Sequence, residues 1–153
     1  MFVLPKLQLD PPQFIGSDLP DIVWDHMAME NWQLSLPNEG WMEEGSIVPG
    51  IQLIAKNETL PCMVLLIKEP QDEGTDRTTY VIETLRIISV NGTQVLGINQ
   101  VMINGEKMAM VRSHKSEVPL LIWIGLKNHI GYSLSCIGEI DLCKAIAETW
   151  RIN

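Results

Sequence analysis

The C-terminal stretch of this chain constrains its fold more than any other segment. Residues 131–136 alternate in the manner of a strand with one buried face. They lead into residues 142–148, which have the pattern of a helix, and the chain then continues as a short apolar–polar stub at residues 149–152. A strand, a short connection, a covering helix and a stub are typical of an α+β domain, in which a helix closes over one face of an antiparallel sheet.

The rest of the chain carries the pattern of a series of strands. An Asn-Gly pair at residues 104–105, flanked by apolar segments, is a strong signal for a two-residue hairpin. An earlier strand would place Trp32, Leu34 and Leu36 on one face. Further strands are predicted at residues 51–56, 63–68, 119–126 and 131–137. The first two of these are apolar runs, so we expect them in the centre of the sheet with both faces largely covered.

Residues 80–90 carry two signals. Apolar residues recur there at helical spacing, but the segment is also rich in Val, Ile and Thr, and Asn91-Gly92 could form a hairpin turn. We predict a helix, because Asp76 or Thr78 can cap its start and Asn91-Gly92 suits a left-handed stop just past its end.

The length of 153 residues and the 46% content of hydrophobic residues suit one domain. Residues 1–20 contain four prolines without a sustained period, so we predict an extended arm there and a single α+β domain at residues 21–153. Residues 22–29 are ambiguous, since Asp21 could cap one or two helical turns. No signal peptide or membrane-spanning segment is evident, and we therefore expect a cytoplasmic location.

The net charge of −8 is unevenly distributed. Residues 1–44 carry eight acidic side chains and one basic side chain, whereas the remaining residues are almost balanced. Such a chain offers no electrostatic footprint for a phosphate backbone, so nucleic-acid binding is not expected. The acidic first third would attract a basic segment of a partner protein if it lies on one face; otherwise it simply solvates the surface.

No group of residues with the spacing of a catalytic or metal site is present in the sequence. The three histidines are isolated, and we predict no cofactor, no metal and no enzymatic activity. Cys62, Cys136 and Cys143 show no CxxC spacing, and we predict three reduced, mostly buried thiols. A bridge between Cys136 and Cys143 across the strand-to-helix connection is the alternative.

Two of the five tryptophans are candidates for a binding surface. Trp32, Trp123 and Trp150 lie in periodic segments and are predicted to be core. Trp24 and Trp41 lie in less regular sequence beside acidic residues, a combination that is typical of protein-binding surfaces. The alternative is that both rings fold back onto the sheet. The candidate protein-binding residues, called the acidic tryptophan patch below, are Trp24, Trp41, Asp21, Asp25, Glu43 and Glu44.

Methionines gather around the Asn-Gly hairpin, at Met102, Met108 and Met110. We predict that they fill the core, although an exposed methionine cluster would make an adaptable apolar surface for a peptide.

The order of these elements resembles that of the PsbP-like family. The resemblance covers about residues 29–153. Near the start it is carried by Trp32-Gln33-Leu34-Ser35-Leu36-Pro37 with Gly40-Trp41, and then by a helix at 80–88 after an acidic loop. The hairpin at 101–105 follows, and residues 132–136 lead to the last helix and Trp150-Arg151-Ile152. It implies an antiparallel sheet with helices packed on it, and a role in binding another protein. The same fold contains a Ran-binding nuclear transport factor and small bacterial proteins, some of them secretion-effector chaperones. No partner-contacting residue of the family matches this sequence position by position.

Together these observations predict a non-enzymatic protein-binding or chaperone-like module with an acidic N-terminal third. The alternative is a small-molecule or lipid-binding domain with a pocket between sheet and helices, which would require an apolar cavity of several hundred cubic ångströms. The sequence indicates neither the partner nor the oligomeric state.

Overall fold

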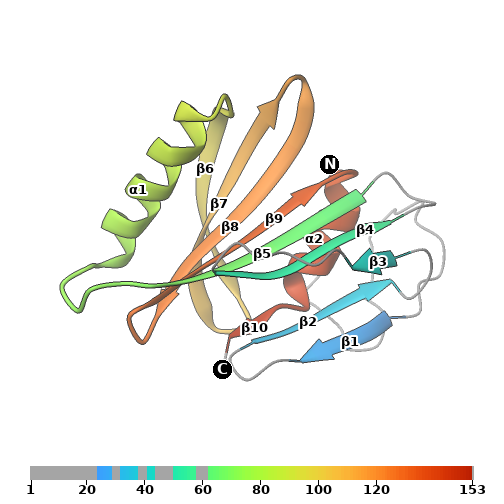
Figure 1. Cartoon of the computed structure of the whole chain (residues 1–153), viewed down its shortest axis with the longest axis horizontal. Coiled ribbons are helices and arrows are strands. Elements are labelled where there is room, and N and C mark those ends of the chain that lie inside the picture. Colours follow the sequence, from blue (N-terminus) through green and yellow to red (C-terminus); the bar gives the residue numbers. More distant parts are fainter. Residues whose placement is uncertain (1–23, 29–31, 38–40, 44–49, 58–61, 153) are drawn as a thin grey trace.

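The computed structural model describes residues 24–28, 32–37, 41–43, 50–57 and 62–152. These form two antiparallel sheets and two helices, which confirms the predicted α+β class (Figure 1). The larger sheet has seven strands in the order β3-β4-β5-β9-β8-β7-β6. In chain order its strands are β3 (Trp41–Glu43), β4 (Ile51–Asn57), β5 (Cys62–Pro70), β6 (Gln94–Ile103), β7 (Glu106–Lys115), β8 (Val118–Lys127) and β9 (Ile130–Ile137). The smaller sheet has the order β1-β2-β10 and consists of β1 (Trp24–Ala28), β2 (Trp32–Pro37) and β10 (Arg151–Ile152).

The two helices, α1 (Arg77–Val90) and α2 (Ile140–Glu148), lie on opposite faces of the larger sheet (Figure 1). Strand β8 shows this separation, because its side chains alternate between the faces. Trp123 belongs to the main core with residues of α2, whereas Ile122 and Ile124 belong to a second cluster with Tyr80 of α1. The main core is therefore formed between α2, the large sheet and β2.

The predicted helix at residues 80–90 is confirmed and begins a few residues earlier, at Arg77. Asp76 is its N-cap, and its carboxylate accepts a hydrogen bond of 2.7 Å from the backbone N–H of Thr79. This bond lowers the pKa of Asp76, because it favours the charged carboxylate. At the other end, Asn91 donates its backbone N–H to the carbonyl of Ile87, and Gly92 has a φ of 91°. A glycine suits this left-handed position just past the helix.

The predicted Asn-Gly hairpin is also confirmed. Asn104 and Gly105 connect β6 to β7 with φ values of 48° and 87°, as a two-residue hairpin with right-handed twist requires. Asn128 and His129 connect β8 to β9 with φ values of 52° and 61°. A third connection, Ser116-Glu117 between β7 and β8, also has positive φ values and was not predicted, because it lacks an Asn or Gly signal.

The β6–β7 turn also holds the C-terminal elements in place. The side-chain amide of Asn104 donates to the carbonyl oxygens of Glu148 at 2.9 Å and Trp150 at 2.7 Å. The ammonium group of Lys127 donates to a carboxylate oxygen of Glu106 at 2.9 Å and to the carbonyl oxygen of Ile152 at 3.1 Å. Carbonyl groups at the end of α2 and in the stub thus find partners outside their own elements.

The smaller sheet joins the body through β2. The predicted shared face of Trp32, Leu34 and Leu36 is confirmed, because all three are buried in the main core. The hydroxyl of Thr149 accepts the backbone N–H of Ser35 at 2.9 Å and so links β2 to the end of α2. Residues 24–28 form a strand paired with β2 and not the helical turns that Asp21 could have capped. Pairing with β2 gives this short segment backbone hydrogen bonds that an isolated turn of helix lacks.

Candidate binding groove

Strand β5 lies in the middle of the larger sheet, as predicted, but only one of its faces is fully covered. On the α2 face, Val64 and Leu66 are completely buried. On the α1 face, Met63, Leu65 and Ile67 are only half-buried, because α1 packs chiefly on β8 and β6. The expectation that both faces would be largely covered is therefore correct for the α2 face alone. A row of apolar side chains on β5 lies beside α1 without a full cover.

This row forms the floor of a groove of about 500 Å³ between α1 and strands β5, β9 and β8. The wall contributed by α1 includes Tyr80, Ile87 and Ile88, and β8 adds Leu120 and Ile122. We refer to this space as the α1 groove. A concave, mostly apolar site of this size with a few polar groups is typical of a ligand site.

Tyr80 fixes one wall of the groove. It is the one buried residue of α1, and its ring covers the backbone of Gly131 at the start of β9. A Cβ atom added at Gly131 would overlap the ring, so only glycine leaves space for this contact. Burial, with a smaller contribution from the charge of Glu69, raises the pKa of Tyr80 to about 12. The phenol is therefore neutral at physiological pH and can donate a hydrogen bond.

The floor of the groove carries two serine hydroxyls in an otherwise apolar setting. Ser133 and Ser135 lie on the α1 face of β9, opposite Ile67 and Leu65 in the β5–β9 register. Both residues line the groove, and Ser133 is buried. Charged groups stand at the ends of the groove, with Glu69 and Glu83 near the start of α1 and Lys115 near its end. This arrangement can hold an apolar group and offer it a few hydrogen bonds.

The sequence predicts a pocket between sheet and helices only as part of the alternative function, and it does not identify the residues that line this groove. The run at residues 63–68 is apolar on both faces, and such a run gives no sign that one face lacks a cover. The position of α1 toward β6, and not over β5, is a tertiary feature.

The structure describes the acidic tryptophan patch only in part. Trp41 is half-buried in β3 and packs against the main core, and its indole N–H is buried without a hydrogen-bond partner among the described residues. Glu43 is exposed in the same strand. The backbones of Trp24 and Asp25 lie in β1, but their side chains fall outside the described residues, as do Asp21 and Glu44. The patch therefore stays a prediction, and Trp41 belongs to the α2 side of the sheet, away from the α1 groove.

The other tryptophans and two methionines fill the core, as predicted. Trp123 and Trp150 are buried, and the ring of Trp150 makes an edge-on contact with Tyr132 at 6.4 Å between centroids. Met108 and Met110 are also buried, whereas Met102 is 58% exposed on β6. The core-filling prediction is thus wrong for Met102, because β6 is the terminal strand of the described larger sheet and its α1 face is open there.

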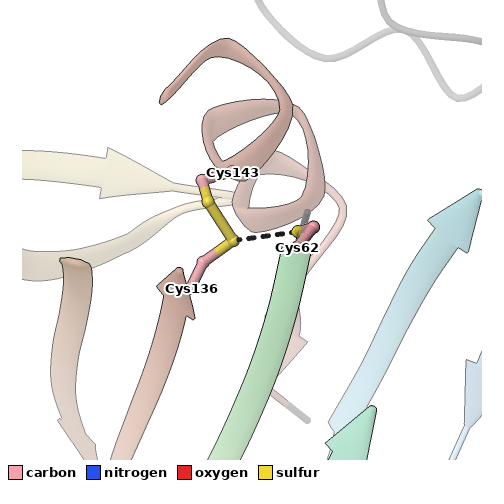
Figure 2. A group of neighbouring side chains, drawn as sticks. All are labelled: Cys62, Cys136 and Cys143. Carbon is pink, nitrogen blue, oxygen red and sulfur yellow. Dashed lines mark hydrogen bonds between the residues drawn. A yellow bond between two sulfur atoms is a disulfide. The ribbon is translucent and has the colours of Figure 1, made fainter. Parts of the chain in front are cut away.

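The three cysteines meet where β5 begins, β9 ends and α2 starts (Figure 2). Cys136 and Cys143 form a disulfide, so the prediction of three reduced thiols is wrong for these two residues. The short connection after β9 turns the first turn of α2 back onto the strand, which places their Cα atoms 5.6 Å apart, within the range that a disulfide spans. Cys62 is a free thiol, with its Sγ 3.7 Å from that of Cys136.

This cluster is structural in its chemistry. Burial raises the pKa of Cys62 to about 12, so its sulfur is a protonated thiol near neutral pH and a weak nucleophile. The sulfurs of Cys136 and Cys143 are oxidised, and a metal ion would require thiolates. The disulfide links β9 to α2 within the main core.

Comparison with known proteins supports the fold. No family model matches the chain, and no curated protein matches it. Among solved structures, the cyanobacterial PsbP (CyanoP) of Synechocystis sp. PCC 6803 matches with a TM-score of 0.68 and 10% sequence identity, over 90% of this chain and 96% of that chain. A protein of Bacteroides thetaiotaomicron matches over 80% of this chain and 45% of its own, with 14% identity and a TM-score of 0.48, too low to support an argument. The predicted PsbP-like fold is confirmed.

Among the described residues, neither helix is long and apolar enough to cross a bilayer.

Proposed function

We propose that this chain is a non-enzymatic protein-binding module that holds an apolar segment of another protein in the α1 groove. The observation that carries this proposal is the row of half-buried apolar side chains along β5, from Met63 to Ile67, beside the uncovered flank of α1. From Met63 to Glu69 the strand extends for about 20 Å. An elongated groove of this length fits a short extended or helical peptide better than a compact small molecule.

The PsbP-like fold is consistent with a binding role. The cyanobacterial PsbP shares this architecture over most of its length. Fold alone does not determine function, so the groove has to carry the proposal. A chaperone-like role is the form of binding that we favour. A groove that shields an apolar segment of a partner from water would keep that segment from aggregating.

The acidic tryptophan patch enters this proposal as a second contact. Trp24, Trp41, Asp21, Asp25, Glu43 and Glu44 would receive a basic segment of the same partner, and the charge of −7 on residues 1–44 is what motivates this assignment. Charges at the edge of an interface mainly raise the rate of association. Reversing Glu43 and Glu44 to Lys should therefore slow association and weaken its salt dependence more than it changes dissociation.

A second candidate function is the binding of a small apolar molecule or lipid in the same groove. The volume of about 500 Å³ favours it, because ligand sites usually measure about 300–1,000 Å³. The hydroxyls of Ser133 and Ser135 would then receive the polar end or a carbonyl of the ligand.

A peptide-display selection against the purified chain tests the main proposal. We expect selected peptides to share apolar residues and to lose at least about tenfold in affinity for Leu65→Lys, because a charge on the groove floor would be desolvated by the peptide. Ile140→Lys is the matched control, because Ile140 is an exposed apolar residue at the start of α2 on the opposite face of the sheet. Circular dichroism confirms that both variants fold.

Three outcomes separate the candidates. Peptides that bind wild type and Ile140→Lys but not Leu65→Lys support the protein-binding proposal. If no peptide depends on Leu65 while a fluorescent fatty acid binds wild type and not Leu65→Lys, the small-molecule function replaces it. If neither probe distinguishes Leu65→Lys from wild type, the groove is not a binding site.

A further inference from the structure

Among the residues that the structure describes, nothing covers the outer edge of strand β6 in the larger sheet. In the described structure it has a neighbour on one side only, strand β7. It is ten residues long, and its sequence, Gln94 to Ile103, contains neither a charged residue nor a proline. Proteins that remain monomeric usually protect such edges with charges, prolines or a cover, because the free backbone groups of an edge strand pair readily with another strand.

The opposite edge of the described sheet is shorter and carries a charge. Strand β3 is three residues long, and it ends on the exposed carboxylate of Glu43. A pairing of β6 from one molecule with β3 of the next would involve few hydrogen bonds. Pairing of β6 with another β6 involves more residues, seven on each side (97–103) when the pair is centred on Gln100, and closes after two copies.

The hairpin geometry identifies the backbone groups of β6 that are free. In a two-residue hairpin the residues that flank the turn, Ile103 and Glu106, exchange hydrogen bonds, and the bonding alternates along the strand from there. The N–H and C=O groups of Ile98, Gln100 and Met102 therefore point away from β7. The same alternation places these three side chains on the α1 face of the sheet.

These side chains match one another about a two-fold axis. In an antiparallel pair of β6 strands centred on Gln100, the two Gln100 side chains lie opposite each other. Ile98, which is 49% exposed, then lies opposite Met102 of the second copy, which is 58% exposed, and the reverse pair completes the symmetry. No like charges meet, because β6 has none.

Helix α1 continues the apolar surface beside this edge. Ile82 is 55% exposed and, together with Ile98, lines a hollow of about 220 Å³ between α1 and β6. A second β6 would bring its own α1 to the same side of the extended sheet, where the two copies of Ile82 and Ile98 would be withdrawn from water.

We propose that two copies of this chain form a symmetric dimer by antiparallel pairing of their β6 strands, centred on Gln100. The pairing joins the two large sheets into one continuous sheet and leaves both α1 grooves open on the β5 side. The dimer is independent of the function proposed above, because it uses the β6 edge of the sheet and not the α1 groove.

Light scattering after size exclusion, over a dilution series of the full chain, tests the proposal. We expect wild type at twice the mass of one chain, and Ile98→Lys with a dissociation constant raised at least about tenfold, since two lysines would enter each interface. Met42→Lys is the matched control, because Met42 is a similarly exposed apolar residue on the opposite edge strand, β3. It should stay dimeric. Wild type that remains monomeric throughout, or a dimer that Ile98→Lys does not weaken, overturns the proposal.

A cross-linking experiment tests the register. In the proposed pair the two Cα atoms of residue 100 are about 5.5 Å apart, a separation that a disulfide can span. Gln100→Cys should therefore form a covalent dimer on mild oxidation. Ser89→Cys, an exposed position on α1, should not. Equal cross-linking of the two variants would contradict the register and with it the proposed interface.

Discussion

The ring of Tyr80 on α1 lies directly over the backbone of Gly131 at the start of β9, and this contact determines where the helix sits on the sheet. Tyr80 is the anchor of α1, while most of its other residues are exposed or half-buried. The contact leaves α1 displaced from β5, and the α1 groove lies in the space between them.

Replacing Gly131 by alanine should therefore destabilise the fold and disturb the groove. A Cβ at this position would overlap the Tyr80 ring, and such overpacking costs about 1–3 kcal/mol of unfolding free energy. Urea denaturation measures the loss. Gly74→Ala is the control, because no atom lies within 4 Å of a Cβ at Gly74, and it should be near neutral. Equal stability of the two variants would show that Tyr80 does not press on this backbone.

The free energy of unfolding should fall at alkaline pH because the buried Cys62 thiol and the buried Tyr80 phenol resist losing their protons in the folded chain. Burial raises the pKa of Cys62 and of Tyr80 to about 12 in each case, above their ordinary values of 9.0 and 10.0. The unfolded chain then loses these protons at a lower pH than the folded chain, so the free energy of unfolding is fully retained below about pH 9 and declines as pH rises toward 12. Urea unfolding at a series of pH values should show this decline. Tyr80→Phe should reduce the part that begins near pH 10, to which Tyr132 also contributes because burial raises its pKa, and leave the earlier part. An identical pH profile for Tyr80→Phe would show that the Tyr80 proton plays no role.

The disulfide should stabilise the fold by a moderate amount. Cys136 and Cys143 are 7 residues apart, and closing so small a loop in the unfolded chain corresponds to about 2.5 kcal/mol. Reduction, or the double variant Cys136→Ser with Cys143→Ser, should lower the free energy of unfolding by about that amount. The third thiol provides an internal check. Cys62 is buried and protonated, so iodoacetamide should label it only after the chain unfolds. Rapid labelling of Cys62 in the native protein would contradict the described cluster.

The side chain of Asn104 should stabilise the C-terminal elements. Its backbone conformation should stabilise the β6–β7 turn. Two hydrogen bonds join its amide to the carbonyls of Glu148 and Trp150, and each is worth about 0.5–1.5 kcal/mol. Asn104→Gly keeps the turn conformation and removes these bonds, so we expect a loss of about 1–3 kcal/mol. Asn104→Ala should lose more, since alanine also disfavours the positive φ. Asn104→Gly with wild-type stability would show that the two bonds contribute nothing.

The elements with local signals were predictable, and those that depend on distant contacts were not. The cap at Asp76 and the stop at Gly92 determined α1, and the Asn-Gly pair determined the β6–β7 hairpin. Strand β1 forms by pairing with β2, and the disulfide depends on how α2 folds back on β9. Neither the β1 pairing nor the disulfide produces a recognisable pattern in the local sequence. A pocket between sheet and helices was predicted only as an alternative, and its place beside β5 escaped prediction for the same reason, because it follows from the position of α1 over Gly131.

Methyl NMR with a peptide from the display selection tests the central claim most directly. If the α1 groove is the binding site, the methyl signals of Leu65, Ile67 and Ile87, which line it, should shift on titration. The signals of Ile140 and Leu142 in α2, on the other face of the sheet, should remain in place. Shifts that are confined to α2, or that spread equally over both faces, would contradict the account.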